Sequence, residues 1–160
     1  MEASMENIET FNVNTSFGLL IGRTSKQMIE QLQQRFVAAE LGISVSHWVI
    51  LAQLWNEDGL AQQEISKRSG VAKPNVTTMV DMLENENYIV RVPDQFDRRI
   101  NRIFLTKKSK ELRFRAITEV LALYETAFTG MTEKEKTLLL KLLTTASQNL
   151  GSLSGSCGYE

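Results

Sequence analysis

Residues 97–106 read D-R-R-I-N-R-I-F-L-T, a run that places three arginines around one turn of the chain. The alternating residues I-F-L near its end predict a short strand. Residues 88–92, Y-I-V-R-V, predict a matching strand upstream that Pro93 closes. Two strands around a short loop make a hairpin, and a loop rich in arginine offers its tip to a polyanion.

Two short helical segments precede this hairpin. Periodicity places one at about residues 61–69 and the other at about residues 73–87, with Gly70 between them as a helix terminator. The second segment buries one apolar face and leaves short polar side chains on its other faces. Helix, turn, helix and basic hairpin, in this order, predict a winged helix-turn-helix domain at residues 44–106.

The first helix of this domain begins at Ser44 or Ser46, both favourable N-cap residues. It ends at the Asn-Glu-Asp-Gly sequence of residues 56–59, where glycine is the terminator. Its predicted buried residues are Trp48, Val49, Ala52, Leu54 and Trp55.

Longer helices flank the domain, at residues 14–41 and within residues 107–150. The C-terminal ones carry more apolar surface than a winged-helix core can cover, so the flanking helices are expected to form a dimerisation region with a second copy of the chain. The predicted fold is therefore mainly α with a small β-hairpin. It forms a single domain at 12–150, with flexible tails at 1–11 and 151–160.

The composition narrows the class of protein. No apolar run approaches the roughly 18 residues that span a bilayer, and the acidic start is not that of a signal peptide. The only cysteine, Cys157, fits a reducing compartment, so a cytoplasmic protein is expected. A single histidine offers no metal cluster, and no P-loop, Gly-rich dinucleotide turn or G-x-S-x-G motif is found. Neither a metal, a cofactor nor an enzyme is therefore expected.

The net charge of −1 hides an asymmetry along the chain. Residues 60–115 contain 12 Lys and Arg against 7 Asp and Glu, a net +5, whereas the remainder contains 6 against 12, a net −6. A basic centre between acidic flanks is typical of a protein with one face for a polyanion. Chance clustering of charges on a solvated surface is the alternative.

In a helix-turn-helix the second helix enters the major groove of DNA by its N-terminal end. Asn75 can bond adenine through two hydrogen bonds, and Thr77 and Thr78 can contact thymine methyl groups or phosphates. The alternative is an ordinary amphipathic helix with a solvated polar face. The predicted DNA-binding residues are Lys73, Pro74, Asn75, Thr77, Thr78, Asp97, Arg98, Arg99, Asn101 and Arg102, with Gln62, Gln63, Lys67 and Arg68 as candidate contacts to the DNA backbone.

Arginine suits the tip of the hairpin, because a flat guanidinium fits the narrow minor groove of A·T-rich DNA and its fork engages phosphates. A carboxylate is unexpected beside a surface that binds DNA, because it repels phosphates. Asp97 is predicted to orient an arginine fork through charge-assisted hydrogen bonds, and its alternative role is that of a turn former.

The order of these motifs resembles the MarR family of bacterial transcriptional regulators. The likeness covers about residues 12–150 and rests on the hairpin pattern D-x-R-x5-L-T, which Asp97, Arg99, Leu105 and Thr106 match. The segments at residues 46–54, 63–71 and 73–84 resemble the family's corresponding helices. The resemblance implies a homodimer with interlocked N- and C-terminal helices, a pseudo-palindromic operator, and release of DNA by a small aromatic ligand.

The chain departs from the family pattern at several positions. Ser109 stands where the family often has glycine, and Thr78 stands where it often has arginine, so base readout is expected to differ. Redox-sensing relatives carry a cysteine near the N-terminus, whereas here the only cysteine is Cys157. The resemblance implies an effector pocket lined by Met28, His47, Trp48 and Leu112. Core packing is the alternative for Met28 and Trp48, and packing or capping for His47.

Together, these features predict a sequence-specific regulator of transcription that binds double-stranded DNA, a repressor released by a small ligand. The alternative is a winged-helix module that binds another protein without direct DNA recognition.

Overall fold

The computed structural model describes residues 11–154, so most of the predicted tails, with Cys157, lies outside the described residues. The elements are η1 (Val13–Thr15), α2 (Phe17–Ala38), α3 (Val45–Asn56), β1 (Leu60–Ala61), α4 (Gln62–Ser69), α5 (Lys73–Asn85), β2 (Ile89–Pro93), β3 (Asn101–Leu105), α6 (Lys107–Ala127) and α7 (Glu133–Ser154). The chain divides into two compact units, Met1–Leu123 and Tyr124–Glu160, and the boundary falls inside α6. The fold is mainly α, as predicted.

Serine caps begin both α2 and α3. The Ser16 and Ser44 hydroxyls accept hydrogen bonds from first-turn amides at 3.4 Å and 3.2 Å, which satisfies donors that a helix start otherwise leaves open. Helix α2 ends at Ala38, before the predicted boundary at residue 41. The chain turns there because Glu40 and Gly42 adopt left-handed backbone angles, with φ of 49° and 70°.

Helix α3 buries a face different from the one predicted. Ile50 and Leu51 are completely buried, and Leu54 and Trp55 are buried as expected. The other three predicted members are only half-buried: Trp48, Val49 and Ala52. Apolar residues lie on nearly every side of α3, so periodicity alone does not select the face that meets the core.

Helices α4 and α5 form the predicted helix-turn-helix. Gly70 ends α4 in the left-handed conformation, with φ of 69°, and α5 begins three residues later. Val76, Val80 and Leu83 on α5 have no exposed surface, which confirms the predicted inward face. The opposite face of α5 is therefore free to carry polar side chains.

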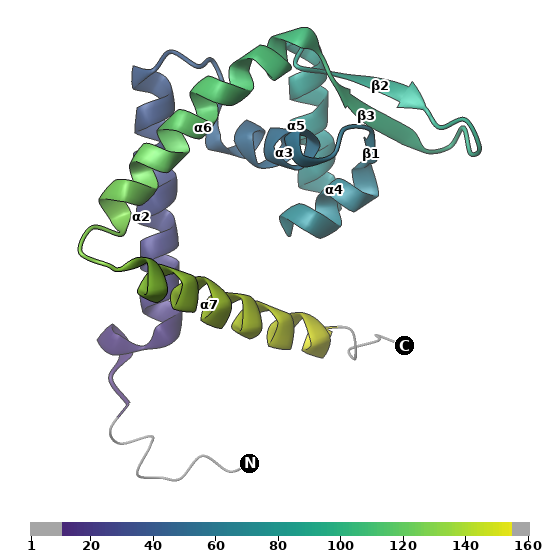
Figure 1. Ribbon diagram of the computed structural model, residues 1–160. Helices are drawn as coiled ribbons and strands as arrows, with labels where there is room; N and C mark the ends of the chain where they lie inside the picture. Colours follow the sequence, from purple (N-terminus) through teal and green to yellow (C-terminus); the bar gives the residue numbers. More distant parts are fainter. Residues whose placement is uncertain (1–10, 155–160) are drawn as a thin grey trace. The chain divides into compact units, whose positions relative to one another are not determined.

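The sheet has three antiparallel strands in the order β1-β3-β2, one more than the sequence predicted. Leu60 of the additional strand β1 pairs with Ile103 of β3, and Ile89 of β2 pairs with Leu105. Gly59 precedes β1 with φ of 79°, and a Cβ there would lie 2.6 Å from the Phe104 ring, so only glycine fits. The β2–β3 hairpin projects away from α3, α4 and α5 as the wing (Figure 1).

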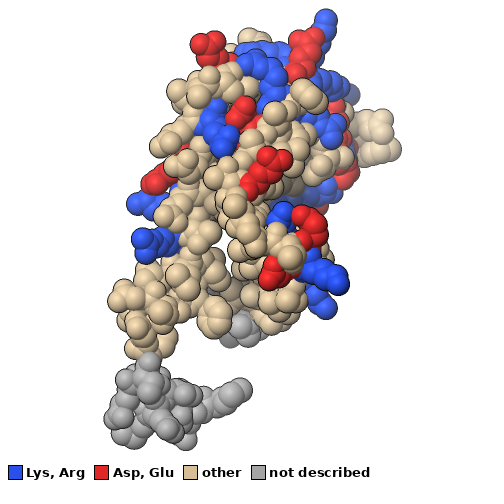
Figure 2. All heavy atoms as spheres, turned by 60° about the vertical axis from the view of Figure 1, so that its left-hand side comes forward, with Lys and Arg blue, Asp and Glu red and all other residues tan. Residues whose placement is uncertain are grey.

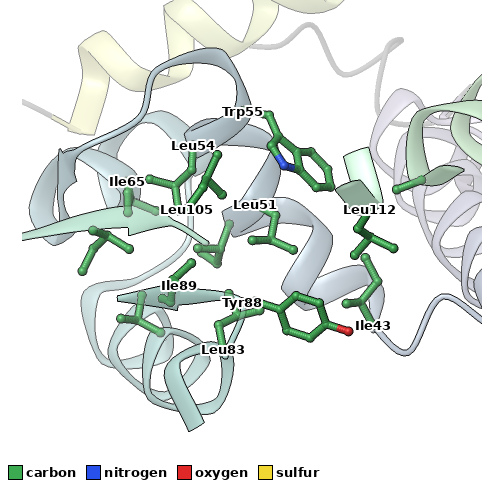
Figure 3. Close-up of a cluster of buried hydrophobic side chains, with 14 of the residues drawn as sticks. Ile43, Leu51, Leu54, Trp55, Ile65, Leu83, Tyr88, Ile89, Leu105 and Leu112 are labelled. Carbon is green, nitrogen blue, oxygen red and sulfur yellow. The ribbon is translucent and has the colours of Figure 1, made fainter. Parts of the chain in front are cut away.

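A single hydrophobic core joins the winged helix to its neighbours within the first unit. Side chains from α3, α4, α5, the sheet and the start of α6 converge in Figure 3, among them Leu51, Ile65, Leu83, Ile89 and Leu112. The Trp55 indole donates to the Ser109 carbonyl at 3.1 Å and so ties α3 to α6. The sheet and the helix-turn-helix therefore share one core, which fixes the wing relative to α5.

The second unit, taken by itself, contains the end of α6 and helix α7. Thr132 and Glu135 form a capping box, in which Glu135 Oε2 accepts the Thr132 amide at 2.7 Å. Helix α7 continues past the predicted end at residue 150 to Ser154. Several of its leucines are exposed: Leu138, Leu140, Leu142 and Leu143. No helix within residues 11–154 is both long and apolar enough to cross a membrane.

Candidate nucleic-acid interface

The outward face of α5 begins with the predicted polar residues. Lys73, Asn75, Thr77 and Thr78 are all exposed. The Thr77 and Thr78 hydroxyls donate to the backbone carbonyls one turn earlier, at 3.1 Å and 3.2 Å, which fixes their rotamers. Their methyl groups and the Asn75 amide therefore remain available to a ligand. The geometry suits the edges of bases in a major groove.

The start of α5 lacks the side-chain cap that α2 and α3 have. Its N-cap residue is Ala72, which makes no side-chain cap hydrogen bond, and Pro74 occupies the first turn. Amides of the first turn are consequently left for another acceptor. A phosphate oxygen is a suitable acceptor, because the positive end of the helix dipole lies at the same place.

An open groove of about 490 Å³ lies between the two helices of the helix-turn-helix. Gln63 and Lys67, two of the predicted contacts to the DNA backbone, line it together with Lys73. Glu64 also lines this groove. Its carboxylate accepts the Arg68 Nε at 2.7 Å, and this ion pair lowers the pKa of Glu64. The groove thus combines the ammonium groups of Lys67 and Lys73 with a carboxylate that is ion-paired to Arg68.

Two of the predicted backbone contacts are engaged within the protein. Arg68 donates to Glu64 and, at 2.7 Å, to Glu57, and these two partners raise the pKa of Arg68. Gln62 donates to the Thr77 hydroxyl at 2.7 Å and so links α4 to α5. Both residues hold the helix-turn-helix together in this structure, rather than facing a ligand freely.

Asp94 organises the loop of the wing. Its buried carboxylate accepts the Phe96 amide at 2.8 Å, the Arg102 Nε at 2.5 Å and the Asp97 amide at 3.1 Å. These three hydrogen bonds lower the pKa of Asp94 from 3.8 to about 2. Two backbone bonds, from Asp94 to Ile100 at 2.8 Å and from Ile100 to Asp97 at 2.9 Å, close the turn.

The tip presents one oriented and one free arginine. Asp97 accepts Nε and Nη2 of Arg99 at 3.1 Å and 3.3 Å, which confirms the predicted fork. It also accepts the Arg99 amide at 3.0 Å, as a turn former does, and these bonds lower the pKa of Asp97. Arg99 remains 91% exposed in its side chain. Arg98 is exposed, and no hydrogen bond or ion pair of its side chain occurs within residues 11–154.

Arg102 does not lie at the tip, where the sequence placed it. It belongs to strand β3, and its guanidinium bonds Asp94 and, at 3.1 Å, the Gly59 carbonyl. The alternating pattern of the strand begins at Asn101, so residues 101 and 102 extend the hairpin beyond the predicted Ile103. Arg102 therefore braces the base of the loop, with about half of its side chain exposed.

Arg91 joins the wing to helix α5. From β2, its guanidinium forms ion pairs with both Asp81 and Glu84 of α5, and its amide donates to Glu84 at 3.1 Å. Partial burial alone would lower the pKa of Arg91, but the two carboxylates outweigh it and the pKa is raised. The two elements expected to contact DNA are thus tied directly to each other.

Sequence reasoning did not single out Asp94 or Arg91. Both residues act through partners in other elements, at separations that no local pattern reveals. A weak signal was present for Asp94, because a carboxylate directly after Pro93 is typical of a loop-closing turn. Arg91 was assigned only to a strand, and nothing in the alternation of that strand indicates two carboxylate partners on a helix.

Three of the four predicted effector residues, Met28, Trp48 and Leu112, belong to the hydrophobic core or pack against it. Met28 and Trp48 pack against the core, and Trp48 lies between Phe36 and Trp55, with ring centroids 6.1 Å and 5.4 Å away. Leu112 is a member of the core itself. His47 is buried but lines a different groove of about 310 Å³, shared with Asn75 and Thr78 on α5. Core packing is the arrangement observed for Met28, Trp48 and Leu112.

One face of the molecule carries charges of both signs. Lys and Arg alternate with Asp and Glu over the charged part of the face in Figure 2, whereas the segment next to the undescribed N-terminal residues carries no charge. In the part of the chain that the structure describes, no group of three or more His, Cys, Asp and Glu could hold a metal ion.

Comparison with known proteins agrees with this geometry. The sequence model of the MarR family matches residues 43–100, from just before α3 to the tip of the wing. The HTH-type transcriptional regulator TtmR of Methylorubrum extorquens is 30% identical over 122 residues, which cover 76% of this chain. The chain belongs to the MarR family. It spans 62% of the length of TtmR.

Solved structures of MarR-type regulators share the fold. The transcriptional repressor CouR, bound to a 23-mer DNA duplex, superposes with a TM-score of 0.72 at 24% identity, covering 92% of this chain and 99% of CouR. BpsR of Bordetella bronchiseptica, whose DNA binding is regulated by 6-hydroxynicotinic acid, gives a TM-score of 0.78 at 18% identity, covering 86% of this chain and 96% of BpsR. These likenesses show the MarR fold of the chain.

Proposed function

We propose that this MarR-family chain is a sequence-specific, double-stranded DNA-binding regulator of transcription. Helix α5 would read base edges in the major groove through Asn75 and Thr78, and the wing would place Arg98 and Arg99 in the adjacent minor groove. The observation that carries the proposal is that α5 and the wing are held together and both have exposed polar or cationic side chains. Helix α5, with its exposed polar start, and the wing, with its exposed arginine tip, pack on one core, and the ion pairs of Arg91 tie them together.

The proposed regulator acts as a homodimer on a pseudo-palindromic operator. Support comes from large apolar side chains at the surface of the flanking helices, where Phe17 is 87% exposed on α2 and Phe114 is 81% exposed on α6. Exposed apolar surface of this extent favours burial against a second copy. Two copies related by a two-fold axis would present two α5 helices to half-sites about 34–36 Å apart.

The proposal also includes regulation of DNA binding by a small ligand. We infer a repressor that a small aromatic acid releases from DNA, in the compartment that holds the chromosome, which in a bacterium is the cytoplasm. CouR is a repressor, and the DNA binding of BpsR responds to 6-hydroxynicotinic acid, so both relatives favour this reading. Met28 and Trp48 pack against the core but are only partly buried, so part of each side chain remains accessible to such a ligand. A panel of aromatic acids at constant ionic strength should contain at least one that weakens operator binding. If none does, the protein has no aromatic effector.

The alternative function is a winged-helix module that binds another protein. The free Arg98 and the exposed Arg99 fork disfavour it, because a protein-binding wing needs no cluster of cations. Fluorescence anisotropy with a random duplex separates the two functions. A DNA-binding protein loses affinity steeply as salt rises, with a logarithmic slope of about 0.9 per phosphate contacted. Absence of salt-sensitive binding at low ionic strength would favour the protein-binding module.

A further inference from the structure

The tip of the wing carries an aromatic side chain that neither the core nor the arginine contacts explain. Phe96 is 89% exposed, the highest exposure among the large apolar residues of the described chain. Single exposed apolar residues are common on protein surfaces, so exposure alone means little. The surroundings of Phe96 are what distinguish it.

The backbone at Phe96 is held in place. Its amide donates to the buried Asp94 carboxylate at 2.8 Å, and the next amide, that of Asp97, donates to the same oxygen at 3.1 Å. Arg102 braces that carboxylate from β3. The ring therefore stands outward on a fixed backbone, so little backbone entropy would be lost when the ring meets a ligand.

Two cationic residues follow Phe96 closely in the same loop. Arg98 and Arg99 follow Phe96 by two and three residues, and both are exposed. The wing is narrow and projects from the helices of its unit (Figure 1). Ion pairs of Arg91 tie it to α5. A loop that exposes an apolar ring and two arginines complements a duplex minor groove. There cations meet phosphates and the electronegative floor, and an apolar side chain can enter a base step.

We propose that Phe96 is an apolar wedge that the wing inserts into the minor groove, where it partly unstacks one base step beside the arginine contacts. The proposal rests on the DNA-binding function proposed above and deepens it. Pyrimidine–purine steps such as TA and CA unstack easily, whereas A-tracts are stiff. The wedge would therefore add sequence preference at a step that no hydrogen bond reads.

The test uses the full-length protein and three variants. Phe96→Ala removes the wedge, Phe96→Leu keeps an apolar one, and Gln95→Ala is a matched change at the neighbouring exposed position of the same loop. Affinity is measured on duplexes that differ only at the step facing the wing, with TA in one and an A-tract in the other. A 2-aminopurine at that step reports unstacking as a rise in fluorescence.

The expected result is a loss of about tenfold for Phe96→Ala on the TA duplex, in the range that base–aromatic contacts contribute. The same variant should lose the preference for TA over the A-tract and the 2-aminopurine signal. Phe96→Leu should retain most of all three, and Gln95→Ala should match the unchanged protein.

Several outcomes would overturn the inference. Equal affinity and equal 2-aminopurine fluorescence for Phe96→Ala and the unchanged protein would reject the wedge. A change in sedimentation with unchanged DNA affinity would assign Phe96 to a contact with another copy of the protein. If Arg99→Ala weakens DNA binding and Phe96→Ala does not, the wedge fails and the DNA-binding function stands. If the unchanged protein binds no duplex, both fail.

Discussion

The buried carboxylate of Asp94 accepts the Nε of Arg102 at 2.5 Å across the base of the wing. This pair shows that the arginines of the wing have two different roles, which the sequence does not distinguish. Arg102 and Asp94 shape the loop from inside, whereas Arg98 and Arg99 remain exposed at its tip. We call Asp94 and Arg102 the supporting layer of the wing, and Arg98 and Arg99 its contact layer. Substitutions in the two layers are expected to have different effects.

The supporting layer predicts a pH response of the wing. Because the pKa of Asp94 falls from 3.8 to about 2 on folding, its contribution to the order of the loop is fully present above pH 3.8. That contribution is lost as the pH falls through about 2. The 13Cγ shift of Asp94 and the amide shift of Phe96 should titrate together with that midpoint. In Asp94→Asn the amide should already lie at its low-pH position near neutral pH. A midpoint near 3.8 would show that the carboxylate is not held as described.

The link between wing and recognition helix predicts a defect in Arg91→Met. The substitution keeps much of the side-chain volume but removes both ion pairs, with Asp81 and with Glu84. Stability should fall by only about 0.5–1 kcal/mol, the scale of partly exposed pairs. Operator affinity should fall several-fold, because the wing is no longer fixed to α5.

Arg68→Met is the matched control for Arg91→Met, since Arg68 also bonds two carboxylates but lies in α4. It should leave the amide shifts of the wing unchanged in an NMR spectrum. Identical effects of the two variants on wing shifts and on affinity would show that Arg91 contributes general stability and no link.

The contact layer predicts that Arg99→Ala weakens DNA binding without unfolding the protein. An exposed substitution of this kind changes stability by within about ±0.5 kcal/mol, whereas the lost groove contact costs roughly 1–3 kcal/mol per site. Arg99→Lys keeps the charge but loses the fork that Asp97 holds, so it should restore only part of the affinity. Anisotropy titrations and a thermal melt measure both quantities. Full affinity in a folded Arg99→Ala protein would remove the wing from the DNA contact.

Substitutions in helix α5 are expected to affect either the sequence specificity or the overall affinity of DNA binding. Asn75→Ala and Thr78→Ala should reduce the ratio of operator binding to random-duplex binding, because base contacts specify. Lys73→Ala should weaken both duplexes alike, since Lys73 lines the groove with Lys67 and is proposed to contact a phosphate. Competition titrations with both duplexes measure the ratio. A common factor for all three variants on both duplexes would argue against base readout by Asn75 and Thr78.

The exposed apolar helices predict a dimer. Sedimentation equilibrium at micromolar concentration should give about twice the chain mass of 18.1 kDa. Replacing Leu140 and Leu143, both exposed on α7, with glutamate should shift the mass toward that of one chain, because buried carboxylates oppose association. Lys141→Ala, a polar change on the same helix, is the control. A monomer for the unchanged protein would refute the dimeric arrangement.

Local patterns predicted much of the fold. The serine cap at Ser44, the glycine stop at Gly70 and the inward face of α5 follow from rules that act over one or two helical turns, and all three are observed. The strand β1 was missed because its two residues acquire strand character only by pairing with β3. The buried face of α3 was assigned wrongly because apolar residues surround that helix and only its partners choose between them.

Local sequence patterns likewise predicted one part of the candidate site and missed another. Exposure of Asn75, Thr78 and Arg98, and the fork from Arg99 to Asp97, involve residues on one surface or two positions apart, so sequence patterns reveal them. The bracing role of Arg102 depends on Asp94 and on the Gly59 carbonyl, which tertiary folding alone brings close. The packing of Met28 and Trp48 likewise depends on how α2 meets α3.

Selection from a random DNA pool tests the central claim most directly, because it needs no assumption about the operator. The account predicts that the purified protein enriches one motif with two inverted half-sites about one helical turn apart, and that Arg99→Ala loses enrichment at positions flanking each half-site. Enrichment of no motif, together with binding that salt leaves unchanged, would contradict the claim that α5 and the wing recognise DNA.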